Sequence, residues 1–66
     1  MPEVRFQYVS NELEFLFKRE LQVLDNIKGF CRKTNKGVEI NYSLFIDEDN
    51  FMLEIIVTDE GKSTNN

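Results

Sequence analysis

Residues 38–58 read VEINYSLFIDEDNFMLEIIVT, two alternating apolar runs on either side of an acidic segment. Alternation with a period of two is typical of strands that bury one face. Burial specifies the register, because a slip of one residue would turn the apolar set of one strand outward. The segment therefore predicts an antiparallel β-hairpin with a four-residue loop at Asp47-Glu48-Asp49-Asn50. The predicted inward pairs are Ile46 with Phe51, Leu44 with Leu53, Tyr42 with Ile55, and Ile40 with Val57.

A short strand and a helix precede the hairpin. Apolar residues occupy every second position at Val4, Phe6 and Tyr8, in alternation with Arg5, Gln7 and Val9, which predicts a half-buried strand. Asn11 can cap a helix, with Glu14 reaching back in a capping box, and Ser10 is a nearly equal alternative. The helix ends either at Gly29 or, as we prefer, near Thr34 before Asn35-Lys36-Gly37. Its predicted core face consists of Leu13, Leu16, Phe17, Leu21, Val23, Leu24, Ile27 and Cys31.

The element order is strand, helix, strand, strand. This order predicts an α+β fold in which one helix packs on a small antiparallel sheet that ends in a C-terminal β-hairpin. We expect a single domain over residues 1–58. Residues 59–66 contain no apolar side chain, so a flexible polar tail is expected there.

Two helix residues depart from the pattern. Phe15 lies on the polar side, where it is either covered by the stems of Lys18 and Arg19 or available to a partner. Glu20 lies within the apolar arc, where it is either a carboxylate tuned for proton chemistry or, as we favour, a rim residue paired with a cation such as Arg5.

The chain is 66 residues long, carries a net charge of −4 and is 41% hydrophobic. A chain of this length buries only roughly 60% of its unfolded surface, and self-association is a common supplement. Cys31 is the only cysteine, so no disulfide can form within one chain. The sequence has no basic-then-apolar leader and no long apolar run, so we expect a cytoplasmic protein that does not insert into a membrane.

Catalytic and cofactor chemistry finds little support in the sequence. The chain has no histidine, which removes the commonest general base and zinc ligand. Residues 47–50 differ from a calcium loop, because Phe51 occupies the place of a fifth-position ligand and no glycine follows. The three glycines are too scattered for a phosphate loop. We expect a protein that is not an enzyme and has no catalytic residue, metal or cofactor.

The sheet face opposite the helix carries an unexplained apolar group. Phe45 and Met52 form a predicted cross-strand pair there, and Ile56 lies further along the second strand. Isolated surface hydrophobes are common, but both strands contribute to this group, which favours an interface. Homodimerisation through this face, a sheet edge or the helix is expected. Our candidate protein-interface residues are Phe45, Met52, Ile56, Glu39, Glu54 and Phe15.

Charge is distributed unevenly along the chain. Residues 37–61 contain acidic residues and no Lys or Arg, whereas Lys28, Arg32, Lys33 and Lys36 crowd the preceding segment around Phe30. The basic cluster is a possible contact for anions or nucleic acid, although cations that complement a helix C-terminus explain it better.

The length, acidity and lack of catalytic groups resemble those of small accessory proteins of bacteria and their phages that bind another protein. Our leading hypothesis is a small acidic, homodimeric regulator or inhibitor that binds a larger protein target through the outer face or edge of its hairpin. The alternatives are a nucleic-acid-binding regulator and a structural subunit of an assembly.

Overall fold

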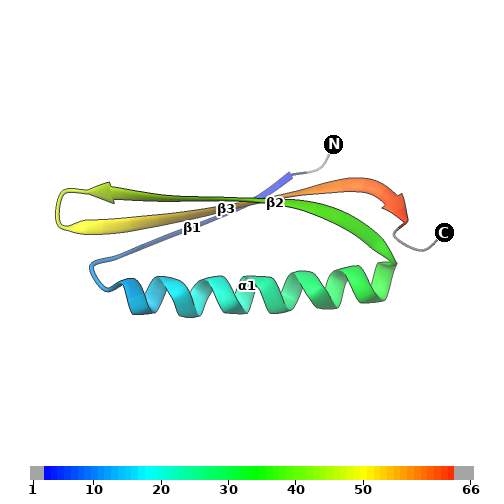
Figure 1. Ribbon diagram of the computed structural model, residues 1–66, viewed down its shortest axis with the longest axis horizontal. Coiled ribbons are helices and arrows are strands. Elements are labelled where there is room, and N and C mark those ends of the chain that lie inside the picture. Colours follow the sequence, from blue (N-terminus) through cyan, green and yellow to red (C-terminus); the bar gives the residue numbers. More distant parts are fainter. Residues whose placement is uncertain (1–2, 64–66) are drawn as a thin grey trace.

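The structure confirms the predicted fold class. A computed structural model describes residues 3–63 as backbone and residues 3–60 with side chains. Its elements are β1 (Glu3–Ser10), α1 (Leu13–Thr34), β2 (Lys36–Asp47) and β3 (Asn50–Ser63). The three strands form one antiparallel sheet in the order β1-β3-β2, so β3 is central and β1 and β2 are the edges. The helix lies along one face of this sheet (Figure 1).

The hairpin has the register that the apolar pattern predicts. Ile46 is opposite Phe51, and the other three predicted pairs are also present. The loop is shorter than expected, because Asp47 pairs with Asn50 and leaves a turn of only Glu48 and Asp49. Glu48 adopts a positive φ of 55°, which lets the chain reverse within two residues.

β3 is longer than the predicted hairpin strand. It continues through residues 59–63, which the sequence assigns to a polar tail. Its partner β2 also begins earlier, and Lys36 pairs with Ser63 beyond a register shift between Lys36 and Val38. Residues 64–66 of the predicted tail lie outside the described residues. Polar side chains do not prevent strand pairing here, because the ladder bonds are made by the backbone.

The start of α1 differs from the prediction. Glu12 occupies the N-cap position and makes no side-chain capping hydrogen bond. The capping box at Asn11 is therefore wrong, as is Ser10 as the N-cap residue. The Ser10 hydroxyl instead accepts a hydrogen bond from the Glu12 N–H at 3.0 Å. This local bond tightens the turn between β1 and α1, as serine side chains commonly do.

The end of α1 agrees with the preferred prediction. The helix continues through Gly29 to Thr34, and Asn35 takes the left-handed conformation with φ 60°. The Asn35 N–H donates to the Cys31 carbonyl oxygen at 2.8 Å. Asn tolerates this conformation better than most residues with a Cβ, so it can end the helix where glycine is absent.

The core of the described residues is small. Four hydrophobic side chains are buried: Leu16, Val23, Leu53 and Ile55. Leu16 and Ile55 are the most enclosed, with exposed fractions of 1% and 0%. Partly buried hydrophobic side chains pack around these four, from Phe6 and Tyr8 on β1 to Ile27 on α1. The core thus lies between α1 and the central strand β3.

The buried face of α1 is narrower than predicted. Phe17 and Leu21, both expected in the core, have exposed fractions of 53% and 65%. Successive helix residues are rotated by about 100°, so Phe17 and Arg19 lie on opposite flanks of the line through Leu16. The Arg19 guanidinium lies 5.7 Å from the Tyr8 ring centroid on β1. The flank with Phe17 and Leu21 therefore faces the β2 edge, where the three-stranded sheet is too narrow to cover it.

The molecule is elongated for its length. Its principal extents are 46 × 20 × 13 Å and its radius of gyration is 13.6 Å, against roughly 11 Å for a compact chain of 66 residues. Figure 1 shows the cause: the tip of the β2–β3 hairpin extends beyond the N-terminal end of α1. Sheet residues near the tip consequently have no helix above them.

Candidate functional site

Five exposed apolar side chains form a group on α1 and on the helix-facing side of β2. We call it the open flank. It consists of Phe17, Leu21, Tyr42, Leu44 and Ile46. Ile46 is the most exposed large hydrophobic residue, with an exposed fraction of 78%. All five were predicted to point inward, so the register prediction was right and the predicted burial was wrong.

The open flank arises from two features of the fold. β2 is an edge strand, so its inward side chains have a neighbouring strand on one side only. The hairpin tip also overhangs the start of α1 (Figure 1), which leaves Leu44 and Ile46 uncovered. Their partners on β3, Leu53 and Phe51, are more enclosed because β3 is flanked on both sides. Exposed apolar side chains that gather on one side of a molecule are typical of an interaction site.

A second apolar group lies on the outer face of the sheet, near the same tip. Met52 on β3 lies between Val9 on β1 and Phe45 on β2, so the three form one row across the sheet. Val9 and Phe45 are exposed and Met52 is partly exposed. We call this group the outer row. It contains two of the candidate interface residues, and Val9 joins them only because β1 pairs with β3.

The other predicted outer-face residues lie apart from this row. Glu54 follows next along β3, where its carboxylate accepts a hydrogen bond from Gln7 Nε2 at 2.7 Å and lies 3.5 Å from Arg5 Nη1. Ile56 comes after it, between Arg5 and Asn41 on the neighbouring strands. A polar strip therefore separates Ile56 from the outer row. Glu39 is exposed at the far end of the same face.

Phe15 and Glu20 occupy the helix rather than the outer face. Phe15 is exposed and lines a shallow cleft beside β1 with Arg19, whereas Lys18 pairs with Glu14 at 3.8 Å. Glu20 is partly buried, as a rim residue would be. Its predicted pairing with Arg5 is wrong, because Arg5 contacts Glu3 and Glu54 on the opposite face of the sheet.

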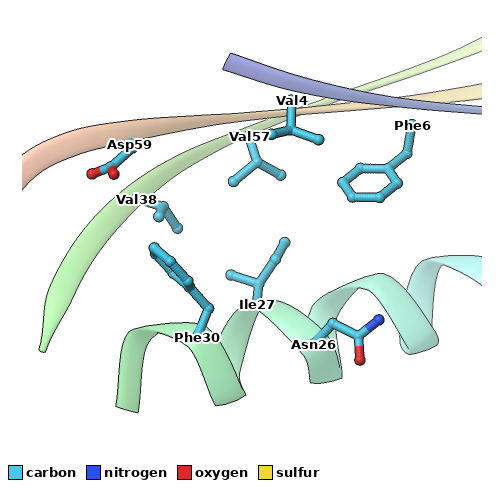
Figure 2. A pocket seen from close by; sticks show the side chains of 8 residues that line it. All are labelled: Val4, Phe6, Asn26, Ile27, Phe30, Val38, Val57 and Asp59. Carbon is cyan, nitrogen blue, oxygen red and sulfur yellow. The ribbon is translucent and has the colours of Figure 1, made fainter. Parts of the chain in front are cut away.

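An apolar pocket of about 360 Å³ lies between the C-terminal half of α1 and the sheet. Figure 2 shows Ile27 and Phe30 of the helix pointing toward Val38 and Val57 of the sheet, with Asp59 at the margin. Its volume is near the lower limit for a small-molecule site. No sequence motif indicates this pocket, because it results from the separation of helix and sheet.

The structure separates Phe30 from two of the four predicted cations. Phe30 points into the pocket, whereas Lys28 and Arg32 are each two positions away and therefore about 160° around the helix. Lys36 lies 3.9 Å from Asp59. The cations remain exposed, and Lys33 lies about 60° from Phe30 around the helix. The Phe30 side chain lines the pocket but is still 42% exposed.

Metal chemistry and membrane insertion find no support in the described part of the chain. Among these residues, no three Cys, Asp or Glu side chains gather closely enough to hold a metal ion. Cys31 is a free, partly buried thiol on α1. Within residues 3–63, α1 is not apolar enough to cross a membrane.

Comparisons with models of protein families, with curated proteins and with solved structures gave no match to this chain.

Proposed function

We propose that this protein is a non-enzymatic binding protein that acts as a homodimer and regulates a larger protein target. The proposal rests on one observation, that more large hydrophobic side chains are exposed than buried. Among the described residues, four hydrophobic side chains are buried while ten large ones are exposed. Single exposed hydrophobes are ordinary, but seven of these ten belong to two surfaces, the open flank and the outer row.

The open flank supports self-association. A core of four side chains is small for a chain of 66 residues, and chains of this length often need a second copy to reach adequate stability. Burial of apolar surface contributes roughly 25 cal/mol per Å². A second copy that covers the open flank would therefore add stabilisation that one copy alone lacks.

The outer row supports binding of a different protein. It lies on the opposite face of the sheet from the open flank, so both surfaces can be occupied together. The row combines an aromatic ring, a methionine and a valine beside the acidic turn at Glu48 and Asp49. Aromatic and methionine side chains are enriched at protein interfaces, and the acidic turn would favour a target with basic residues beside an apolar groove.

Two measurements test the proposal. Sedimentation equilibrium of the wild type should give a dimer at micromolar concentration, and a monomer at about 100 µM would contradict the homodimer. For the target, pull-downs from the native host should capture the same protein with the wild type and with Asn41→Asp. Phe45→Asp should fail to capture that protein. Asn41 lies on the same outer face but outside the outer row. Identical capture by both variants would refute the role of the outer row.

A further inference from the structure

We infer that the homodimer forms by antiparallel pairing of β2 with β2 of a second copy, with Tyr42 on the two-fold axis, so that one six-stranded sheet carries both helices on the same face. The inference rests on the proposed homodimer and specifies its geometry. β2 is the edge strand whose inward side chains are uncovered. An edge of this kind has backbone groups available for pairing with another chain.

The β1 edge is less suited to this pairing. Two of its inward side chains, Phe6 and Tyr8, are partly buried against the core, and Arg19 lies over the Tyr8 ring. The third, Val4, is exposed. On β2, by contrast, Tyr42, Leu44 and Ile46 are all exposed. Pairing at β2 is thus the arrangement that covers unburied apolar surface.

The alternation of β2 restricts the register. Inward residues of β2 have even numbers, and directly opposite residues in a sheet share a face. The two-fold axis must therefore place one residue of β2 opposite the same residue of the second copy. It cannot fall midway between two consecutive residues of the strand. With the axis at Tyr42, Leu44 is opposite Ile40 of the second copy and Ile46 is opposite its Val38. Every inward residue from Val38 to Ile46 then meets an apolar partner.

Pairing with the axis at a neighbouring residue of β2 is less favourable. An axis at Ser43 places Glu39 opposite Asp47 of the second copy, and an axis at Leu44 places Glu39 and Ile40 opposite the turn at Glu48 and Asp49, beyond the end of β2. Like charges directly opposite each other are destabilising. An axis at Asn41 places Ile46 opposite Lys36, beyond the register shift in β2. Only the Tyr42 register uses the whole regular strand and leaves Glu39 opposite the uncharged Phe45.

The overhanging tip explains why the arrangement is complementary in shape. In each copy, Ile46 lies at the end that α1 does not cover, whereas Val38 lies where α1 covers the sheet and lines the apolar pocket. Antiparallel pairing places the uncovered end of one copy beside the covered end of the other. Ile46 of the second copy then extends the apolar wall formed by Val38 and Phe30.

The two ends of the molecule also differ in charge. The acidic turn with Glu48 and Asp49 lies at the same end as the start of α1, while the last turn of α1, with Arg32 and Lys33, lies at the other (Figure 1). Asp59 and Glu60 of β3 are at this second end too, and Lys36 contacts Asp59. In the antiparallel dimer, the exposed cations at the end of α1 come close to the acidic turn of the second copy, despite Asp59 and Glu60 at the same end. This attraction favours the antiparallel orientation.

Cysteine cross-linking tests the axis directly. In a Cys31→Ser background, Tyr42→Cys should form a disulfide-linked dimer under mild oxidation, because residues opposite each other have Cβ atoms about 4.5–5.5 Å apart. Glu39→Cys is the matched control on the same strand. Its two copies would be separated by six residues, roughly 20 Å along the strand, so it should not cross-link.

A spin-label measurement keeps the test decisive if the Tyr42 variant fails to fold. A label at Glu39→Cys should give an intermolecular separation of roughly 20 Å in the Tyr42 register, against roughly 14 Å and 27 Å for axes at Asn41 and Ser43. Cross-linking at Tyr42 with the 20 Å separation supports the inference. A dimer with any other separation overturns this geometry but keeps the proposed homodimer, whereas a monomeric wild type overturns both.

Discussion

Leu44 and Leu53 lie directly opposite each other on the helix-facing side of the hairpin, yet Leu53 is buried with 7% exposure and Leu44 is 51% exposed. The two side chains have the same chemistry and the same orientation relative to the sheet. They differ because Leu53 is on the central strand and Leu44 is on the edge. This pair marks the limit of the core within one chain, and the open flank begins at Leu44.

Alanine substitutions of these two leucines should have different effects on the free energy of unfolding. We expect Leu53→Ala to lower the free energy of unfolding by about 2–5 kcal/mol, because it leaves a cavity in the core. Leu44→Ala should cost about 1 kcal/mol or less when the chain is a monomer, since water already reaches the side chain. Urea denaturation at submicromolar protein gives both values. Equal losses at that concentration would contradict the difference in burial between the two positions.

Protein concentration supplies a second comparison for the same pair. Dimerisation stabilises the folded state by mass action, so its contribution grows with concentration. The cost of Leu44→Ala should therefore increase between submicromolar and 100 µM protein, whereas the cost of Leu53→Ala should change little. A concentration-independent cost at Leu44 would argue against its burial in the dimer.

The local pattern of the sequence determined much of the fold. Apolar residues at every second position over Val38–Ile46 and over Phe51–Val57 were enough to specify the hairpin register, because each alternative would expose one apolar set. The helix and its end near Asn35 followed from spacing and from a residue that tolerates a positive φ. These features depend on interactions between residues close in sequence or directly paired.

The candidate site depended on information that local patterns do not contain. Val9 joins the outer row only because β1 pairs with β3 rather than with β2, and nothing within residues 4–9 specifies that neighbour. Phe17 and Leu21 belong to the apolar arc of α1, but their exposure is set by the width of the sheet and the position of the helix across it. Tertiary packing decides both, so periodicity alone overestimated the core.

Gly29 offers a test of the helix interior. It lies on the exposed side of α1, and a Cβ added there would meet nothing within 4 Å. Gly29→Ala should raise the free energy of unfolding by about 1 kcal/mol, because alanine has the better helix propensity. For a domain of this size the melting temperature should rise by about 4–8 °C. An unchanged or lower melting temperature by circular dichroism would contradict a regular helix at this position.

The hairpin turn provides a matched pair of glycine substitutions. Glu48 has a positive φ and its neighbour Asp49 does not. Glu48→Gly should stabilise the protein by about 1–2 kcal/mol, because it removes the steric cost of a Cβ in that conformation. Asp49→Gly removes an acidic side chain too but should destabilise by about 0.5–1 kcal/mol through added flexibility of the unfolded chain. Opposite shifts in urea midpoint would confirm the turn geometry, and shifts of the same sign would indicate a charge effect instead.

A carboxylate introduced into the open flank should weaken the dimer, whereas one introduced into the outer row should not. Ile46→Asp introduces a carboxylate into the open flank, and a symmetric dimer contains it twice. Burying one isoleucine contributes about 1.5–3 kcal/mol, so the loss of two should weaken association by at least about 100-fold. Val9→Asp adds the same charge to the outer row and should leave the dimer intact. Sedimentation velocity distinguishes the variants, and dissociation by Val9→Asp with a persistent Ile46→Asp dimer would assign the dimer interface to the outer face.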